Sequence, residues 1–298
     1  MIVLVTGANG QVGQNLLKLQ SSTVHTLIGL TKGELDITQE KNVLQAFAKY
    51  QPDIVINAAG YTAVDKAESE INKAYAVNEK GPSNLALACA QLHIPLLHIS
   101  TDYVFDGCKN SAYIETDPVN PLGVYGRSKE AGEQAIRSAL EQHIILRTSW
   151  VFSAEGNNFV KTILSLGAKQ DSVNVVDDQF GGPTSAAAIA NVLLAIAKHY
   201  FSGAQVNWGT YHFCELPYVS WYEFANEIFE QASNIGIIKY KVRVNPVPSS
   251  SYLTAVNRPK NSRLLTKKLV DSLRLDQLDW RNSLNTALIQ LKTIELRN

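Results

Sequence analysis

The chain of 298 residues is 45% hydrophobic and 18% charged, which is the composition of an ordinary soluble protein with room for a sizeable core. Its 27 basic residues balance its 27 acidic ones. The net charge therefore gives no indication of a nucleic acid, an anionic membrane or a polyanionic substrate as a partner.

Three further features narrow the class of protein. No stretch approaches the roughly 18 apolar residues of a membrane span, and the start MIVLVTGANG lacks the basic front and long apolar run of a signal peptide. We therefore expect a cytoplasmic protein without membrane contact. Cys89, Cys108 and Cys214 are odd in number and unclustered, which fits neither a disulfide framework nor a metal site. We expect all three to be packing residues.

Short apolar runs rich in β-branched residues alternate with longer amphipathic segments along the first half. The runs predict buried strands at 2–5, 26–30, 53–59, 94–100 and 143–149, and the segments between them have helical periodicity. Strands that are apolar throughout need cover on both faces, and helices between them make right-handed crossovers of a parallel sheet. The pattern predicts a doubly wound, Rossmann-like α/β fold.

The order of elements loosens after about residue 150. We expect a helix near 157–168, a strand at 174–176 and another helix after the stretch GGPTSAAAIA. No linker-like tract separates the two parts. Residues 1–150 are expected to form the dinucleotide-binding core. Residues 151–298 are expected to add further core elements and a smaller, discontinuous substrate lobe over the carboxyl edge of the sheet.

The first predicted strand runs directly into a glycine-rich turn, TGANGQVGQNLL, with Gly7, Gly10 and Gly13 in a GxxGxxG arrangement. Such glycines allow a tight turn and let the backbone and a helix N-terminus approach a pyrophosphate. The position between the first strand and the first helix favours a dinucleotide site over a plain strand-to-helix turn. The expected cofactor contacts in this turn are Gly7, Asn9, Gly10, Gln11 and Val12.

The end of the second predicted strand bears on the choice of cofactor. It reads IGLTKGELD, with Lys32 and no carboxylate immediately at the place where an Asp or Glu would bind the ribose 2′-hydroxyl. We therefore expect NADPH, with NADH as an alternative, and expect Lys32, Asp36 and Ile37 to lie near the adenosine end. The residues that follow the third strand either line the cofactor channel or simply end that strand: Gly60, Tyr61 and Thr62.

Tyr125 and Lys129 lie four residues apart in VYGRSKEAGE, within the predicted first turns of a helix, and therefore share one helix face. The pair has two interpretations: a catalytic tyrosine beside a lysine that tunes it, or a solvated helix that carries both by chance. Thr101 ends the fourth strand at the edge where the nicotinamide should lie, and it is a candidate hydroxyl partner for Tyr125. A nearby ammonium stabilises a phenolate, which makes proton transfer near neutral pH easier.

With these motifs, the sequence resembles the extended short-chain dehydrogenase/reductase superfamily and, within it, the dTDP-4-dehydrorhamnose reductases. The resemblance covers nearly the whole chain through GANGQVG, PDIVINAAGYTAVDKAE, STDYVFDG, NPLGVYGRSKEAGE, RTSWVFSAEGNNF, DDQFGGPT and NRPKNSRL. The first, third and fourth occur widely in the superfamily, whereas YTAVDKAE, RTSWVF with GNNF, and DQFGGPT are typical of this reductase. The joint match favours the catalytic interpretation of Tyr125 and Lys129.

The resemblance implies reduction of the C4 ketone of dTDP-4-dehydro-L-rhamnose to dTDP-L-rhamnose with a nicotinamide cofactor. It implies that Tyr125 donates a proton to the substrate oxygen and that Thr101 hydrogen-bonds the same oxygen. Lys129 is implied to bind the nicotinamide ribose and to lower the pKa of the tyrosine. Asp102 either tunes proton affinity in the site or caps a turn.

Residues of the second half fit a nucleotide sugar as substrate. Trp150 can lay its ring against the sugar, with core packing as the alternative. Asn158 in GNNF and Thr184 in GGPT are candidates to hydrogen-bond the nucleotide or pyrophosphate, and Arg258 in NRPKNSRL is a candidate partner for phosphate charge. Trp221, by contrast, is expected in the core of the lobe.

Two helical stretches bear on the binding of a structural metal. Some members of the family dimerise around a divalent cation held by glutamates in the first helix and in the helix after PT. The corresponding stretches here, QVGQNLL and PTSAAAIAN, hold no carboxylate, so we expect no structural metal and leave a monomer or homodimer open.

The alternatives to the reductase are a related nucleotide-sugar epimerase or dehydratase, and a non-catalytic, reductase-like regulatory subunit. Dehydratases usually have an acidic pair beside the threonine, but here Asp102 is followed by Tyr103. The intact set of Thr101, Tyr125 and Lys129 disfavours the regulatory subunit.

Overall fold

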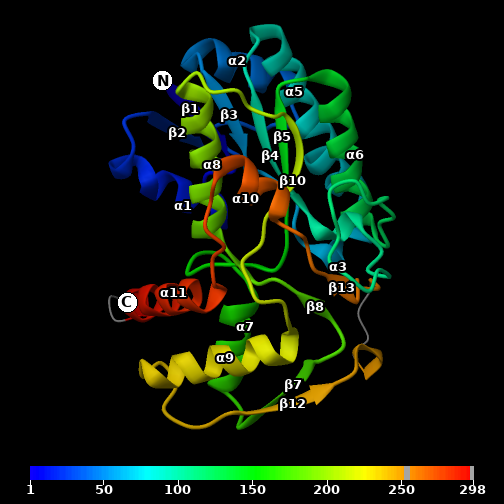
Figure 1. Cartoon of the computed structure of the whole chain (residues 1–298), viewed down its shortest axis with the longest axis vertical. Coiled ribbons are helices and arrows are strands. Elements are labelled where there is room, and N and C mark those ends of the chain that lie inside the picture. Colours follow the sequence, from blue (N-terminus) through cyan, green and yellow to red (C-terminus); the bar gives the residue numbers. More distant parts are fainter. Residues whose placement is uncertain (252–255, 296–298) are drawn as a thin grey trace.

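The computed structural model describes residues 1–251 and 256–295, and its larger part is built on a six-stranded parallel sheet with strand order β10-β5-β4-β3-β1-β2 (Figure 1). The strands are β1 (Ile2–Thr6), β2 (Thr26–Leu30), β3 (Ile54–Asn57), β4 (Leu96–Thr101), β5 (His143–Thr148) and β10 (Gly209–His212). The five strands expected from the sequence are present, and the doubly wound α/β fold is confirmed. The sequence pattern does not predict β10, because GTYH lacks an apolar run.

Helices cover both faces of this sheet. One face carries α1 (Gln11–Lys18) and α8 (Ala186–Phe201), and the other carries α2 (Glu40–Tyr50), α5 (Gly81–Leu92) and α6 (Val124–Ala139). Neighbouring residues of β1 show the two-sided burial: Val3 and Val5 pack under α8, and Leu4 packs under α2 and α5. A parallel sheet sandwiched between helices needs such continuous apolar strands.

The lobe beyond the carboxyl ends of the strands has its own apolar core, around Phe152, Phe224 and Trp280 (Figure 1). It contains α7 (Phe159–Gly167), α9 (Trp221–Asn234), α11 (Trp280–Glu295) and the parallel pair β7 (Ser172–Val176) and β12 (Arg243–Val247). β10 is a strand of the sheet and α8 packs on its face, although both follow residue 150. The chain therefore returns from the lobe to the sheet before it enters the lobe again.

Shorter elements complete the sheet domain and the lobe. They are η1 (Leu19–Ser22), α3 (Val64–Ala67), α4 (Ile71–Tyr75), the π-helix η2 (Ala76–Lys80), η3 (Asp102–Val104), β6 (Val151–Phe152), β8 (Phe180–Gly181), β9 (Thr184–Ser185), β11 (Val219–Ser220), η4 (Ser249–Ser251), β13 (Asn261–Ser262) and α10 (Lys267–Leu273). β6 pairs with β9, and β8 lies between β11 and β13. In the part of the chain described, no helix is both long and apolar enough to cross a membrane.

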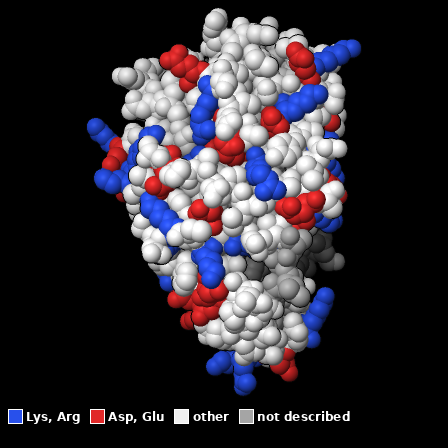
Figure 2. Space-filling view, turned by 90° about the vertical axis from the view of Figure 1, so that its right-hand side faces the viewer, with Lys and Arg blue, Asp and Glu red and all other residues white. Residues whose placement is uncertain are grey.

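The distribution of surface charge and the burial of two of the three cysteines agree with the expectations from the sequence. Figure 2 shows cationic and anionic side chains interspersed over the face in view, as the zero net charge suggests. Cys89 and Cys214 are buried in apolar clusters, as expected of packing residues. The expectation is wrong for Cys108, which is exposed in the turn after Gly107.

Candidate active site

The glycine turn after β1 is shaped for close approach of a ligand to the backbone. Gly7 has φ +69°, and a Cβ atom there would lie 2.6 Å from the backbone nitrogen of Ala59, so only glycine fits. A Cβ at Gly13 would lie 2.3 Å from the carbonyl oxygen of Gly7, so this glycine lets α1 pack onto the turn.

The start of α1 is open to an anion. No side chain among the described residues caps this helix at Gly10, and its first turn holds no acidic residue. The first N–H groups of a helix lack intrahelical partners, and the helix dipole favours negative charge there. The turn therefore fits the pyrophosphate of a dinucleotide. Asn9 and Gly10 are exposed, Gln11 is half-buried, and the side chain of Val12 enters the core.

The turn after β2 holds a carboxylate that the sequence analysis did not place there. Glu34 Oε2 accepts hydrogen bonds from Thr31 N at 2.9 Å and from Thr31 Oγ1 at 2.8 Å. These hydrogen bonds lower the pKa of Glu34. The expectation that this place has only the exposed Lys32 is thus corrected, because the four-residue turn folds the glutamate back onto the strand end.

Asp36 and Ile37, the residues expected near the adenosine end, differ in whether the side chain is available to a ligand. Asp36 Oδ1 accepts from the backbone nitrogen of Thr38 at 3.0 Å and from its hydroxyl at 2.8 Å. Both hydrogen bonds within this turn therefore go to Oδ1 and not to Oδ2. Ile37 is buried, its side chain packs against Gly81, and its carbonyl accepts from Asn84 Nδ2 at 2.9 Å. The side chain of Ile37 therefore belongs to the core rather than to a ligand surface.

The segment after β3 is held by a residue that the sequence pattern did not single out. Buried Asn78, in η2, accepts from Tyr61 N at 2.8 Å and donates to Tyr61 O at 3.1 Å and to Ser128 Oγ at 3.0 Å. Asn78 thereby ties the segment to α6, while Gly60 and Thr62 stay exposed beside the glycine turn. A single π-helical turn often marks a functional site.

Tyr125 and Thr101 meet at the carboxyl edge of the sheet. The Thr101 side chain lies close enough to the Tyr125 hydroxyl to lower its pKa, and the ring of Tyr103 packs edge-on against Tyr125 with centroids 5.4 Å apart. A Cβ at Gly126 would lie 2.2 Å from the carbonyl oxygen of Tyr103. The glycine after the tyrosine therefore allows α6 to start in contact with the end of β4.

A second unpredicted residue fixes the start of this helix. Glu68 Oε1, from the segment YTAVDKAES, accepts from the backbone nitrogen of Val124 at 2.7 Å. A carboxylate at a helix N-terminus satisfies an unpaired N–H group and complements the dipole. Glu68 thus holds the backbone of Val124, the neighbour of Tyr125. The two residues are far apart in the chain, so no local sequence pattern predicts this contact.

Burial shifts the pKa values of Tyr125 and Lys129. Burial raises the pKa of Tyr125, the Thr101 side chain lowers it and the nearby Asp102 raises it, with a net rise to about 12. Lys129 Nζ donates to the carbonyl oxygen of Ile99 at 2.7 Å, and burial lowers the pKa of Lys129 to about 8. Lys129 Nζ is thus directed at β4, and the lowering of the tyrosine pKa by Lys129 stays a prediction.

Asp102 is part of the same buried edge. Its carboxyl is 3% exposed and Oδ1 accepts from Thr101 Oγ1 at 3.1 Å. Burial raises the pKa of Asp102 to about 6. The carboxyl therefore orients the threonine hydroxyl, and the side chain is not free on the surface.

A pocket of about 440 Å³ lies in the lobe between α7, β7 and the segment around Arg258. Phe159, Gln179 and Trp221 are among its lining residues together with Arg258. Arg258 Nη2 also donates to Asp65 Oδ2 at 3.0 Å, in the segment after β3. The guanidinium thus connects the pocket wall to the sheet domain.

Trp150 and Trp221 lie together on the apolar core of the lobe. Their rings are stacked with centroids 3.5 Å apart and planes inclined by 10°. A Cβ at Gly181 would lie 2.6 Å from Cε2 of Trp150, so this glycine lets the backbone approach the ring. Trp221 packs on the lobe core, as expected, and it also lines the pocket, whereas Trp150 is not among the lining residues.

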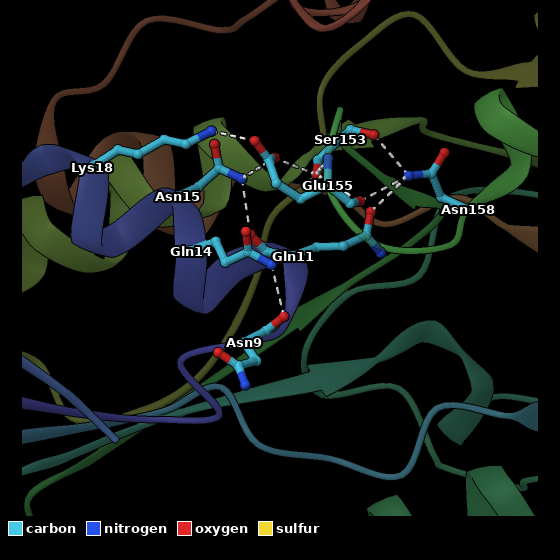
Figure 3. Close-up of polar contacts among 8 residues, drawn as sticks. All are labelled: Asn9, Gln11, Gln14, Asn15, Lys18, Ser153, Glu155 and Asn158. Atoms are coloured by element: carbon cyan, nitrogen blue, oxygen red, sulfur yellow. Dashed lines mark hydrogen bonds and ion pairs between the residues drawn. The ribbon is translucent and has the colours of Figure 1, made fainter. Parts of the chain in front are cut away.

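Figure 3 shows that the loop 153–158 lies against α1, so Asn158 contacts the glycine-turn helix. Asn158 Nδ2 donates to Gln11 Oε1 at 2.9 Å and to Ser153 O at 2.7 Å, and its Oδ1 caps α7 at Lys161 N. Its polar atoms are thus engaged within the protein. In the same way, Thr184 is fully buried and its hydroxyl donates to Gly182 O at 2.9 Å.

Beyond Asn158, the loop is fixed by Glu155. Asn15 Nδ2 donates to Glu155 Oε2 at 3.1 Å, and Lys18 forms an ion pair with the same carboxylate (Figure 3). The first helix therefore carries partners for a carboxylate of the lobe. Among the described residues, no group of three or more His, Cys, Asp or Glu side chains is placed to hold a metal ion.

The parallel sheet, the open glycine turn and the Thr101–Tyr125 pair with Lys129 behind it define an extended short-chain dehydrogenase/reductase. The chain belongs to the family described as the RmlD substrate binding domain, whose profile matches residues 1–293.

The similar proteins cover almost the whole chain. A dTDP-4-dehydrorhamnose reductase of Aggregatibacter actinomycetemcomitans is 43% identical over 95% of this chain and 96% of its own. The structure of a dTDP-4-dehydrorhamnose reductase of Clostridium acetobutylicum aligns with a TM-score of 0.90 at 37% identity, covering 98% of this chain and 100% of that one. That of Bacillus anthracis, solved in complex with NADP, has a TM-score of 0.88 at 36% identity and covers 97% and 99%.

Proposed function

We propose that this protein reduces the C4 ketone of dTDP-4-dehydro-L-rhamnose to dTDP-L-rhamnose with NADPH as the reductant. The observation that carries the proposal is the placement of Tyr125 beside Thr101 at the sheet edge, together with an open glycine turn. The names of the similar proteins support the substrate, and the NADP complex of the Bacillus anthracis protein supports the cofactor.

When bound, NADPH supplies the hydride that C4 of the sugar receives. Tyr125 donates a proton to the C4 oxygen as negative charge develops there, which is general acid catalysis. In the structure the one hydrogen of the Thr101 hydroxyl is donated to Asp102 Oδ1 at 3.1 Å, so the hydroxyl turns this hydrogen from Asp102 to the C4 oxygen when the substrate binds. Gln11 and the N–H groups at the start of α1 hold the diphosphate of the cofactor.

The lobe supplies the substrate contacts. Trp221 offers its aromatic side chain to the deoxysugar or the thymine, because it lines the pocket while its ring stacks on Trp150. Arg258 offers charge to the diphosphate of the nucleotide, and Asp65 holds the guanidinium in place. Asn158 and Thr184, the other two candidates, are engaged by the protein contacts described above and are not among the residues that line this pocket.

The direct test is an assay of the purified protein with NADPH and enzymatically generated dTDP-4-dehydro-L-rhamnose. We expect loss of NADPH absorbance in step with the appearance of dTDP-L-rhamnose. Reactions without the keto sugar, or with dTDP-glucose in its place, should keep their NADPH. An epimerised or dehydrated sugar formed without net use of NADPH would favour a related nucleotide-sugar enzyme, and no reaction with bound sugar would favour a regulatory subunit.

The turn after β2 leads to a prediction about the cofactor. Lys32→Ala should raise the dissociation constant of NADPH by roughly twofold to fivefold, the size expected for one exposed charge, and should leave that of NADH unchanged. Glu34→Gln should act in the opposite direction, because it removes a negative charge beside Thr31 where a 2′-phosphate would lie. Fluorescence titrations with both cofactors measure this. Lys41→Ala, an exposed lysine on α2, is the control, and an equal loss of NADH affinity in Lys32→Ala would contradict the assignment.

A further inference from the structure

A chain of buried hydrogen bonds runs beneath the site from the first strand to the catalytic helix. Thr6 Oγ1 donates to Asn57 Oδ1 at 2.6 Å, Asn57 Nδ2 lies 2.9 Å from His98 Nδ1, and His98 Nε2 lies 3.2 Å from Lys129 Nζ. Thr6, Asn57 and His98 are fully buried, and Lys129 is 5% exposed. The chain crosses β1, β3 and β4, and it links the strand that carries the glycine turn to α6.

The direction of these hydrogen bonds fixes the tautomer of His98. Asn57 Oδ1 accepts from Thr6 and also from the backbone N–H of Ala59 at 3.1 Å, so the amide nitrogen of Asn57 must face the imidazole. That nitrogen donates, so His98 Nδ1 accepts and carries no hydrogen. Burial keeps the pKa of His98 well below its usual value, so the ring is neutral and its hydrogen is on Nε2.

The Nε2–H group of His98 therefore points at Lys129 Nζ. An ammonium has three donors and no lone pair, so two donors would face each other at 3.2 Å if the lysine were charged. A neutral amine, in contrast, accepts from His98 and still donates to Ile99 O at 2.7 Å. The geometry thus favours an uncharged Lys129 when no cofactor is bound, which agrees with the lowering of its pKa to about 8 by burial.

We propose that His98 is a positioning residue that favours the neutral amine of Lys129 in the cofactor-free protein, so that at alkaline pH, where this amine forms, NADPH binding is coupled to uptake of one proton by Nζ. The buffered solvent supplies the proton, and the ribose hydroxyls accept from the ammonium that forms. The ammonium beside Tyr125 then stabilises the phenolate that proton donation leaves. The proposal rests on the proposed function, because it needs the nicotinamide ribose to lie at Lys129.

The other titratable groups around Lys129 do not titrate in the same pH range. Asp102, in η3, has its pKa raised to about 6 by burial, and Tyr125, on α6, has its pKa raised to about 12. Glu133, one turn further along α6, raises the pKa of Lys129, but Arg147 and Arg137 bind its carboxylate and hold its own pKa low. On β5, burial lowers the pKa of His143.

Linkage sets the expected result for the full-length protein. Below about pH 8 the lysine is protonated with and without the cofactor, so no proton is taken up. At pH 9, calorimetric titration with NADPH in two buffers of different ionisation enthalpy should show uptake approaching one proton. The dissociation constant of NADPH should then rise about tenfold per pH unit above pH 8, until the pH reaches the higher pKa of the lysine in the complex.

Three variants separate this coupling from a structural role of the histidine. His98→Gln can turn its amide oxygen toward Nζ and accept from the ammonium, so uptake at pH 9 should fall well below the parent value and the affinity should stay constant to a higher pH. Lys129→Met should abolish uptake. His143→Gln replaces a buried histidine that contacts Leu140 O and not Lys129, and it should keep the parent uptake.

The outcomes distinguish the two proposals. Normal NADPH affinity at pH 7 without proton uptake at pH 9 would overturn the coupling and leave the reductase function intact. Equal uptake by the parent protein and His98→Gln would also overturn the role of His98. A protein that does not bind NADPH at pH 7 would overturn both proposals. The measurements on the parent protein and on Lys129→Met decide the coupling even if His98→Gln does not fold.

Discussion

Replacing Tyr125 by phenylalanine is expected to lower kcat by roughly 10²- to 10⁴-fold, because it removes the general acid. The variant loses one oxygen and keeps the ring, which packs against Tyr103 and contributes to the small apolar cluster between α3, α4 and α6. The hydroxyl lies beside Thr101 at the end of β4 and not in the glycine turn, so the change leaves that turn untouched. The dissociation constant of NADPH should therefore change little.

Companion variants show whether the effect belongs to the hydroxyl. Tyr75→Phe removes a hydroxyl from the same apolar cluster and should turn over at the parent rate. Thr101→Val should slow turnover without loosening NADPH, whereas Lys129→Ala should lower both the rate and the affinity for NADPH. Steady-state kinetics and NADPH titrations of these variants make the comparison. A folded Tyr125→Phe protein with the parent kcat would mean that VYGRSKEAGE is an ordinary helix.

Replacing Arg147 by methionine is expected to lower the free energy of unfolding by about 3 to 5 kcal/mol, the cost of leaving one partner of a buried ion pair alone. Arg147 Nε and Nη2 donate to fully buried Glu133 at 2.9 and 2.6 Å. Arg137 also donates to this carboxylate at 2.6 Å, but it is partly exposed and remains in the variant. The expected loss therefore lies toward the lower end of that range.

The pH dependence gives this prediction a definite sign. In the parent protein the pKa of Glu133 is lowered against its burial, chiefly by Arg147, so the pair stabilises the fold above the unfolded-state pKa of about 4.3 and the contribution is lost as the pH falls through the lower folded-state pKa. Without Arg147 the folded-state pKa rises, so the variant should lose more stability at pH 7 than at pH 5.

Denaturant unfolding at the two pH values measures the difference. The double variant Glu133→Leu with Arg147→Met should recover much of the loss, because no buried charge remains. Glu141→Gln, an exposed carboxylate after α6, should stay within about 0.5 kcal/mol of the parent. A loss below about 1 kcal/mol in Arg147→Met at pH 7 would show that the pair contributes little.

The sequence by itself determined the elements whose signal is local. The strands 2–5 and 143–149 follow from continuous apolar runs, and the glycine turn follows from Gly7, whose φ of +69° favours glycine, and from Gly13, whose Cβ would meet the carbonyl oxygen of Gly7. The helical spacing of Tyr125 and Lys129 likewise placed them on one helix. Such features depend on residues a few positions apart, so their pattern is readable along the chain.

Only the tertiary structure decided which polar atoms face a ligand and which face the protein. It stacked the ring of Trp150 on Trp221 and placed Trp221 on the pocket, and it engaged Asn158 with Gln11, 147 residues away in the chain. It also placed His98 Nε2 at 3.2 Å from Lys129 Nζ. These outcomes depend on packing between segments that are far apart in sequence, where distance, burial and the direction of a hydrogen bond are properties of the folded chain alone.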